Sequence, residues 1–519
     1  MLSDNGTLAD RTARSKIRSL AEMSDLADEY RRAGQKIVLA HGTFDLLHLG
    51  HVRYLEEARR QGDVLFVTVT ADRFVNKGPT RPAFGEHLRA EMLGALSCVD
   101  WVAINNAQTA VNVIESVRPD VYVKGVEYRD AGNDVTGKIV DERRAVEAYG
   151  GTVHFSDDAT YSSSELINRH LDTSDPEVRR YLEHARSRGF LTRIPELIDR
   201  ISDKRVLLIG ETIIDEYIYV SPLGRPPKES VLATLRQGHE VFAGGVIAAA
   251  NHVADFCREV NVITAIGERE SYEDTVRRTL RPNVGLSLYH RSEKPTIRKI
   301  RYIEHDFYRK LFEVYVMDDA LLPDELENRM LREIESKAKD ADVVIVTDFG
   351  HGLISPRMRE TLTRDSRFLA VNAQSNSANH GFNLVTKYSH ADYVCIDAPE
   401  ARLAIGDKDA DPAKIAGELL HKAMSVDRLV VTHGRNGCVV FDRDNGIRRV
   451  PAFTRRVLDT MGAGDAFFSV TAPLAAITDD MEAVGFIGNI VGSVKVGILG
   501  HRAAVEKATV LKYVQTLLK

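Results

Sequence analysis

Short apolar runs alternate with amphipathic stretches along most of this chain, and this rhythm limits the folds open to it. In the first part of the sequence the apolar runs lie at residues 36–42, 64–71, 101–104, 121–125 and 152–155. Helical patterns such as HVRYLEEARRQG separate these runs. Alternation of this kind predicts a parallel, doubly wound α/β sheet.

The same rhythm starts again after a charged stretch, which predicts a second α/β domain. It begins with RVLLIG at residue 205 and continues through runs such as DVVIVTDFG and RLVVTHG. A shorter strand-like pattern at 217–241 predicts a small β lid over the second sheet. The predicted organisation is a helical extension at 1–34, a first domain at 35–171, a linker with helices at 172–204 and a second domain at 205–519.

Length and composition narrow the class of protein. At 519 residues the chain exceeds one ordinary hydrophobic core. A formal net charge of −6 argues against nucleic acid as a partner, because a nucleic-acid binder needs a basic surface. The sequence has no apolar run of about 18 residues and no signal-peptide core, so we expect no membrane span. The four cysteines lack a CxxC spacing, which favours a reducing, cytoplasmic location.

One motif lies where the first apolar run ends, in the segment HGTFDLLHLGH. A helix is expected to begin at or just before Gly50, and a helix N-terminus at the end of a strand attracts phosphate. His48 and His51 are three residues apart, which places both side chains on one face of that helix. Two imidazoles there can donate hydrogen bonds to the α-phosphate of a nucleotide during an in-line displacement. The motif predicts nucleotidyl transfer.

GTFDLLHLGHVRYLEEARRQGD resembles the cytidylyltransferase-like superfamily, whose signature pairs a strand ending in G-x-F-D with HxGH. The resemblance implies His48 and His51 as catalytic residues. It implies a nucleotide site formed by Gly42, Thr43, Phe44, Lys77, Arg81, Lys124, Gly125, Ser162, Ser163 and Ser164. Lys77 and Arg81 have an alternative interpretation as solvated loop charges, and the three serines one as ordinary helix N-caps.

A second motif, DTMGAGD, occupies residues 459–465. Its glycines, Gly462 and Gly464, flank Ala463 in a turn that is expected to open a helix near Asp465. Backbone N–H groups in such a turn can approach a transferring phosphoryl group. The Asp465 carboxylate can then accept the proton of an attacking sugar hydroxyl. The motif predicts phosphoryl transfer to an alcohol.

DTMGAGD closely resembles a signature of the ribokinase-like (PfkB) carbohydrate kinases. The resemblance implies Asp465 as catalytic base and the amides of Gly462, Ala463 and Gly464 as an anion hole. It places Thr432, Gly434 and Gly437 near ATP, and Asp215, Gly244, Gly245 and Asn251 near the sugar. It links Asp397 and Glu400 indirectly to Mg²⁺. For Asp215, a loop-capping carboxylate is the alternative.

Three positions depart from the pattern of these kinases. The pair Gly244–Gly245 is separated from Asn251 by extra residues in AGGVIAAANHVA, and Asn372 stands where an acidic residue is more usual. Asp397 replaces the asparagine of an N-x-x-E motif. The first two departures affect the acceptor side and the phosphate path, so the identity of the sugar stays open.

The two motifs together resemble the bifunctional heptose-7-phosphate kinases/heptose-1-phosphate adenylyltransferases, which make ADP-heptose for bacterial surface polysaccharide such as lipopolysaccharide, although here the domain order is reversed. The resemblance implies a sugar phosphate and ATP as small-molecule partners, with CTP as the alternative nucleotide of the transferase. We expect Mg²⁺ at both sites and a homodimer formed through the lid. Two other hypotheses are a regulator with one inactive domain and a sugar kinase with a nucleotide-sensing domain.

Overall fold

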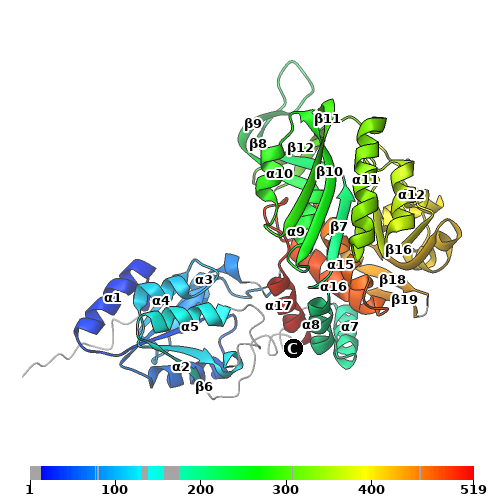
Figure 1. Ribbon diagram of the computed structural model, residues 1–519. Coiled ribbons are helices and arrows are strands. Elements are labelled where there is room, and N and C mark those ends of the chain that lie inside the picture. Colours follow the sequence, from blue (N-terminus) through cyan, green and yellow to red (C-terminus); the bar gives the residue numbers. More distant parts are fainter. Residues whose placement is uncertain are drawn as a thin grey trace, which may run out of the picture. The chain divides into compact units, whose positions relative to one another are not determined.

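The computed structural model describes residues 13–75, 77–78, 81–129, 138–156, 175–306, 308–443, 445–454 and 457–519. The chain separates into two compact units, one made of residues 1–174 with 511–519 and the other of residues 175–510 (Figure 1). Each unit contains a wholly or mainly parallel sheet with helices on its faces. The prediction of two doubly wound α/β domains is therefore confirmed.

In the described part of the first unit, six strands form one sheet in the order β1-β4-β3-β2-β5-β6, and all neighbouring strands pair in parallel. The strands are β1 (Ile17–Arg18), β2 (Ile37–Gly42), β3 (Val64–Thr70), β4 (Trp101–Asn105), β5 (Val121–Gly125) and β6 (Thr152–Ser156). The helices are α1 (Leu20–Arg32), α2 (Leu49–Arg59), α3 (Glu86–Gly94), α4 (Val111–Val117) and α5 (Lys138–Ala148).

The inner strands of this sheet are apolar on both faces because helices cover both. Along β2, Val38 and Ala40 pack in one hydrophobic cluster, while Ile37 and Leu39 pack in another on the opposite face. Continuous apolar runs are typical of such parallel strands. The sequence analysis did not predict β1, since a strand of two residues carries no periodic signal.

The described part of the second unit has a main sheet of nine strands in the order β11-β10-β7-β14-β15-β16-β17-β18-β19. The pairs β17–β18 and β18–β19 are antiparallel, and the other pairs are parallel. The strands are β7 (Arg205–Gly210), β10 (Glu259–Arg269), β11 (Val284–Pro295), β14 (Val343–Asp348), β15 (Leu369–Ala373), β16 (His390–Asp397), β17 (Ser425–Thr432), β18 (Cys438–Asp442) and β19 (Gly446–Val450).

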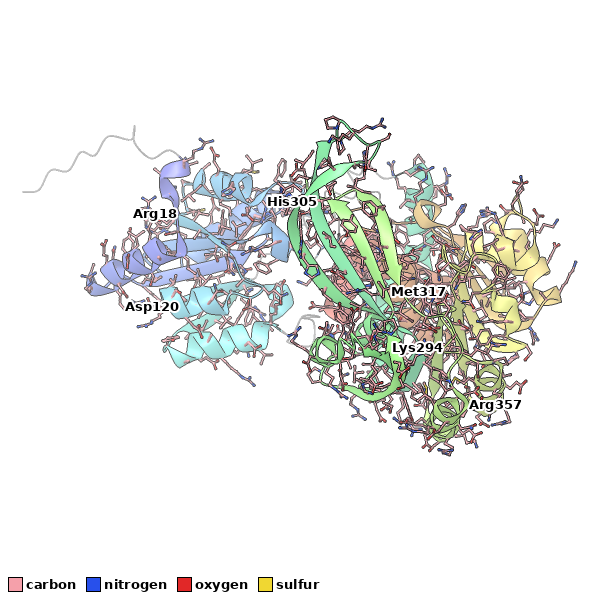
Figure 2. All side chains as sticks on the ribbon, turned by 90° about the horizontal axis from the view of Figure 1, so that it is seen from above. Arg18, Asp120, Lys294, His305, Met317 and Arg357 are labelled. Atoms are coloured by element: carbon pink, nitrogen blue, oxygen red, sulfur yellow. The ribbon has the colours of Figure 1, made fainter. Side chains whose placement is uncertain are left out.

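A separate four-stranded sheet, the lid, forms from segments far apart in the sequence. Its order is β13-β12-β8-β9, with β8 (Thr212–Gly224), β9 (Ala233–Gly245), β12 (Arg298–Glu304) and β13 (Lys310–Val316). The predicted lid at 217–241 lies within β8 and β9, whereas β12 and β13 were not predicted. His305, labelled in Figure 2, follows β12 directly.

Helices cover both faces of the main sheet. One hydrophobic cluster joins residues of α11 and α12 to alternate residues of β7, β14 and β15, and α15 packs against α9 and α16 elsewhere in the unit (Figure 1). The helices of this unit are α7 (Pro176–Ser187), α8 (Phe190–Arg200), α9 (Val246–Val253), α10 (Glu273–Thr279), α11 (Asp324–Asp340), α12 (Pro356–Asp365), α13 (Ala398–Ile405), α14 (Pro412–Lys414), α15 (Ala463–Ala475) and α16 (Met481–Lys495). A last helix, α17 (Lys507–Leu518), begins in this unit, and its residues from 511 onward belong to the first unit.

The four cysteines are free thiols; Cys257, Cys395 and Cys438 are buried and Cys98 is partly buried. Among the residues that the structure describes, no helix combines the length and the apolar character needed to cross a bilayer.

Candidate active sites

The first candidate site lies at the carboxyl end of β2, where the chain enters helix α2. His48 caps this helix: its Nδ1 accepts a hydrogen bond of 3.1 Å from the backbone N–H of Gly50. The ring of His51 lies beside it, with 4.0 Å between the two ring centroids. Both imidazoles therefore lie at a helix N-terminus, where backbone amides without helical partners attract anions.

Both rings are held in the neutral form. Burial lowers the pKa of His51 to about 3, and the neighbouring His48 and Lys77 act in the same direction. Burial also lowers the pKa of His48. Because Nδ1 of His48 accepts a hydrogen bond, the single proton of the neutral ring lies on Nε2. Nε2 is then a hydrogen-bond donor suited to a phosphate oxygen.

Phe44 packs its ring against His51. Its backbone has φ = 47°, and its ring meets the ring of His51 edge-on with centroids 5.4 Å apart. A Cβ atom on Gly42 would lie 3.1 Å from the Phe44 ring, so glycine at this position leaves the ring its space. Thr43 presents its carbonyl oxygen to the guanidinium of Arg89.

The basic residues after β3 are buried or form ion pairs and hydrogen bonds within the protein. Arg81 pairs with Asp45 at 3.0 Å, and their side chains are only 5% and 0% exposed, which excludes a solvated loop charge at Arg81. Burial lowers the pKa of Lys77, while Asp45 acts in the opposite direction. Arg89 is buried and donates to Thr43 O and Thr70 O, so it braces the loops beside the site.

Lys124, at the end of β5, pairs with Glu142 at 2.8 Å in a buried position. Glu142 also accepts a hydrogen bond of 3.0 Å from the hydroxyl of Tyr122. Gly125 ends the strand. The predicted nucleotide residues Ser162, Ser163 and Ser164 lie outside the described residues.

The second candidate site lies at the carboxyl ends of the parallel strands of the main sheet, the usual position of ligands in such folds. Helix α15 begins there at Ala463, after Gly462 with φ = 69°, and its first turn carries Gly464 and Asp465. The Asp465 carboxylate is nearly buried and accepts a hydrogen bond from the Gln374 side-chain amide. Burial raises the pKa of this carboxyl.

Asp215 reaches the same region from the lid strand β8. It accepts hydrogen bonds from the Arg301 guanidinium and, at 3.1 Å, from His501 Nε2. Burial would raise its pKa, but the charge of Arg301 and the contact with His501 outweigh this, and the pKa falls well below its usual range. Asp215 is therefore an ionised carboxylate, 3% exposed, and not a loop cap.

The glycine pair Gly244–Gly245 lies against this carboxylate. A Cβ atom on Gly244 would lie 2.2 Å from Asp215 Oδ2, and one on Gly245, where φ = 59°, would lie 2.3 Å from the backbone oxygen of Glu211. Only glycine fits either position. Asn251, further along α9, bonds with both ends of its amide to the backbone at 279–281.

Asp397 and Glu400 form a capping box at the start of α13. Asp397 Oδ1 accepts from the Glu400 N–H at 2.7 Å, and Glu400 also accepts from the Ser375 N–H at 3.0 Å. Burial, with Asp397 as a second cause, raises the pKa of Glu400 to about 8. A bound cation would offset the charge repulsion between these two carboxyls. No group of three metal-ligating side chains occurs among the described residues.

The segment after β17 contains the predicted nucleotide residues. Thr432 ends the strand, and a single turn follows at Gly434–Asn436. Gly434 and Gly437 have φ = 52° and 81°, conformations that glycine adopts without strain. A Cβ atom on Gly437 would also lie 2.0 Å from the backbone oxygen of Val450.

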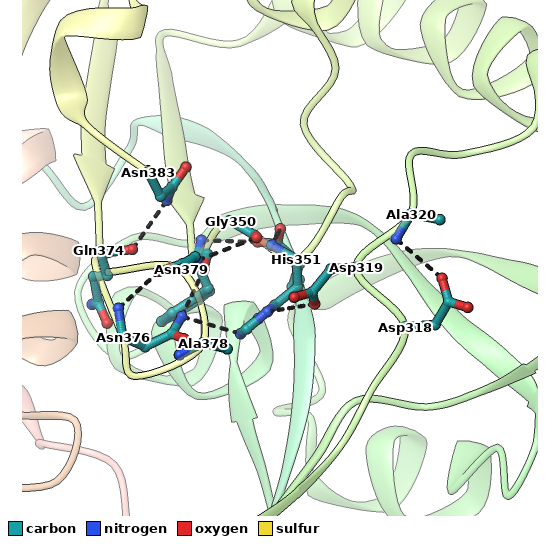
Figure 3. A network of polar contacts seen from close by, with 12 residues as sticks. Asp318, Asp319, Ala320, Gly350, His351, Gln374, Asn376, Ala378, Asn379 and Asn383 are labelled. Atoms are coloured by element: carbon teal, nitrogen blue, oxygen red, sulfur yellow. Dashed lines mark hydrogen bonds and ion pairs between the residues drawn. The ribbon is translucent and has the colours of Figure 1, made fainter. Parts of the chain in front are cut away.

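A network of polar contacts, shown in Figure 3, fixes the loops after β14 and β15. The buried ring of His351 lies 3.0 Å from Asp319 and 3.4 Å from the Asn376 amide. Glu211, also buried, accepts from the backbone N–H groups of Phe349 and His351, both at 3.0 Å. These contacts fix the loops at the carboxyl ends of these inner strands of the main sheet.

The sequence analysis missed several residues that line the second site. They are Glu211, Lys299, Arg301, Gln374 and His501. Lys299 and Arg301 alternate along β12 with outward-facing residues, a period-two signal that was available in KIRYIEH. The side-chain amide of Asn372 donates a hydrogen bond of 2.6 Å to the backbone oxygen of Cys395.

A family model for pfkB family carbohydrate kinases matches residues 203–508, which is more than half of the sequence. The chain belongs to the pfkB family of carbohydrate kinases. A cytidylyltransferase-like model matches residues 39–169. The chain therefore carries a pfkB kinase domain after a nucleotidyltransferase domain, the reversed order noted above.

The relatives of the first unit are called "Bifunctional protein HldE". The chain is 40% identical over 161 residues to the protein of Syntrophotalea carbinolica, which covers 30% of this chain and 31% of that one. It is 42% identical over 141 residues to the protein of Geobacter metallireducens, or 27% of each chain. The chain thus spans less than a third of the length of these relatives.

Among solved structures, phosphofructokinase-2 from Escherichia coli in complex with potassium is similar to the pfkB unit, with a TM-score of 0.49 and 15% sequence identity. The similarity covers 60% of this chain and 99% of that one.

Proposed function

We propose that this chain is a bifunctional enzyme that makes a nucleotide-activated sugar. The pfkB unit phosphorylates a sugar phosphate at its anomeric hydroxyl with ATP, and the first unit transfers a nucleotidyl group to the resulting sugar 1-phosphate. One observation carries the proposal: in each unit, a helix begins near the carboxyl ends of the parallel strands and holds reactive side chains at its N-terminus. These side chains are two neutral imidazoles at α2 and a buried carboxylate at α15.

In the kinase step, Asp465 accepts the proton of the attacking hydroxyl. The hydroxyl oxygen forms a bond to the γ-phosphorus as the bond to ADP breaks. Burial raises the pKa of Asp465, which makes it a stronger base once it is ionised. The amides of Gly462, Ala463 and Gly464 face the charge that develops on the phosphoryl oxygens.

In the transferase step, a phosphate oxygen of the sugar 1-phosphate attacks the α-phosphorus of the nucleotide, and pyrophosphate leaves. His48 and His51 donate hydrogen bonds to the α-phosphate oxygens, where negative charge accumulates. Neither ring changes its protonation state, in agreement with their lowered pKa values. Phe44 and Gly42 fix the orientation of His51 for this role.

The carboxyls of Asp397 and Glu400 fit an indirect Mg²⁺ site, since Mg²⁺ commonly uses one or two carboxylates together with substrate phosphates. When bound, Mg²⁺ offsets the charge of the triphosphate.

Heptose 7-phosphate is the leading acceptor and ATP the leading nucleotide, because the paired motifs resemble heptose kinase/adenylyltransferases and the first unit is similar to proteins called HldE. CTP is the alternative for the transferase. The test is a matrix of sugars and sugar phosphates against ATP and CTP, read by mass spectrometry. We expect a sugar 1-phosphate and then a nucleoside diphosphate sugar. Absence of both products with every pair would refute the proposal.

We also propose that the chain forms a homodimer through the lid. Leu223, Val231, Leu232 and Leu235 are each at least 50% exposed at the β8–β9 end of the lid, and exposed apolar patches commonly mark interfaces. Light scattering should give twice the chain mass for the wild type and the monomer mass for Leu232→Asp/Leu235→Asp. A monomeric wild type would contradict this.

A further inference from the structure

His501, which no sequence motif assigned, lies between the predicted sugar residues and the anion hole. Its Nε2 is 3.1 Å from Asp215 Oδ2. A Cβ atom on Gly244 would lie 3.1 Å from the same Nε2, and one on Gly462 would lie 2.8 Å from His501 Cε1. The imidazole thus fills the space where the acceptor site and the phosphoryl site meet.

The position of this ring is fixed by contacts on both sides. Lys495 donates to Met461 O at 2.7 Å and to Gly500 O at 2.8 Å, which ties the DTMGAGD turn to the segment before His501. Asp459, the first residue of that motif, accepts from the Gly500 N–H at 2.9 Å. The ring is held beside the anion hole by backbone contacts that do not involve its own nitrogens.

The neighbours of His501 decide which nitrogen carries its proton. Asp215 is ionised and can only accept hydrogen bonds, so Nε2 must be the donor. In the neutral ring, Nδ1 is therefore a hydrogen-bond acceptor. Nδ1 is buried and has no hydrogen-bond partner among the residues that the structure describes. The His501 side chain as a whole is 7% exposed.

A buried acceptor without a partner is unfavourable, and a ligand that donates to it gains the contact. The group that a sugar offers at this place is a hydroxyl. Each oxygen of Asp215 already accepts a hydrogen bond, one from Arg301 and one from His501. The carboxylate thus fixes the orientation of the imidazole, with Nδ1 left to bind the acceptor.

We propose that His501 binds the acceptor, its Nδ1 accepting a hydrogen bond from a sugar hydroxyl, and that Asp215 acts as a positioning residue that orients the ring. This rests on the proposed kinase function. It changes the expected role of Asp215, which acts on the sugar through His501.

Two substitutions separate this role from a purely structural one. In His501→Asn the amide oxygen can replace Nδ1 as an acceptor, but the donor to Asp215 is lost. In His501→Gln the amide can still donate to Asp215 from the position of Nε2, but the acceptor at Nδ1 is lost. We expect His501→Gln to raise the KM of the acceptor about 10- to 100-fold, and His501→Asn to raise it less.

The assay uses the full chain with heptose 7-phosphate and a panel of hexoses, pentoses and their phosphates. For both variants, the KM of ATP and pyrophosphate release by the transferase should stay within about twofold of the wild type, since neither depends on this hydroxyl. His305→Gln is the matched control, because His305 also lies beside an aspartate, 3.1 Å from Asp306, but is 56% exposed.

If His501→Gln keeps the wild-type acceptor KM, or if His501→Asn is the more damaged of the two, the ring only supports Asp215 and the inference is wrong. A wild-type enzyme that phosphorylates no acceptor refutes the proposed function, and this inference with it. If the wild type is active and His501→Gln keeps the wild-type acceptor KM, this inference is wrong but the proposed function is not.

Discussion

The protonation of a single residue, Asp465, depends on several of its neighbours. Burial raises the pKa of its carboxyl, and the negative charge of Asp215 acts in the same direction. The neighbouring His501, the Gln374 amide and the Lys299 ammonium lower it. A base at this position must be ionised to accept the proton of a hydroxyl. The balance among these neighbours therefore sets the lowest pH at which the kinase works.

Gln374→Glu tests this balance. A carboxylate in place of the amide puts a like charge beside Asp465, which raises the pKa of Asp465 further. Because activity is lost as the pH falls through that pKa, the acid limb of the kcat/KM profile should move to higher pH. The measurement is kinase kcat/KM from pH 5 to 9. Gln237→Glu, at an exposed lid position 3.1 Å from Ser221, is the control. Coincident profiles for all three proteins would contradict the prediction.

Lys299 is a second residue whose charge should matter. It is 8% exposed, burial lowers its pKa, and the anionic groups that act on it include Asp215 and Asp465. Lys299→Met removes a buried positive charge near Asp465, where the proposed function has a triphosphate react, so kinase kcat should fall about 10²- to 10³-fold. Lys294→Met, at a position labelled in Figure 2 and paired with Asp318 at 2.6 Å, should leave kcat within about twofold. Equal rates would show that Lys299 does not reach the reaction.

The sequence predicted the residues of contiguous motifs better than those assembled by folding. His48 and His51 lie three residues apart, and their juxtaposition at a helix start follows from helix geometry alone. His501, by contrast, meets Asp215 across 286 positions of the sequence. No local periodicity encodes such a contact, because it depends on how the lid, α15 and the segment after α16 pack together.

Among the secondary-structure elements, the lid shows the same division. Its strands β8 and β9 form an antiparallel hairpin-like pair, which the local pattern at 217–241 indicated. Strand β12 joins β8 in parallel, with Lys299 opposite Asp215 and Arg301 opposite Tyr217. Parallel pairing needs a long crossover, so the strand that supplies Lys299 and Arg301 could not be assigned to the lid from sequence alone.

Strand β9 offers a test of how closely the lid approaches the site. In Gly244→Ala the new Cβ atom would lie 2.2 Å from Asp215 Oδ2, so the carboxylate and His501 must shift. We expect kinase kcat/KM to fall at least about 10-fold and the free energy of unfolding to fall by about 1–3 kcal/mol. Gly238→Ala, on the same strand, meets only Tyr219 at 3.5 Å and should be near wild type in both measurements. A fully active Gly244→Ala would mean that the acceptor site lies elsewhere.

In the whole molecule, each of the two units has its own sheet, its own core and its own candidate site. The apolar rhythm predicted these two folds because parallel strands buried on both faces leave a strong sequence signal. The choice of sugar has no such signal. In the proposed function it depends on Lys299, Arg301 and His501, which lie around Asp215 and come from separate parts of the second unit.

The separation of the two sites predicts that either activity can be removed without the other. Asp465→Asn keeps the shape of the side chain but removes the base, so kinase activity should fall about 10²- to 10⁴-fold while pyrophosphate release from supplied sugar 1-phosphate stays unchanged. His51→Ala removes a donor to the α-phosphate and should lower transferase activity about 10²- to 10³-fold with the kinase intact. Circular dichroism checks that both variants are folded. An equimolar mixture of the two variants should make the complete product from the sugar phosphate, since each supplies the step that the other lacks. Loss of both activities in either folded variant would show that the two sites are not independent.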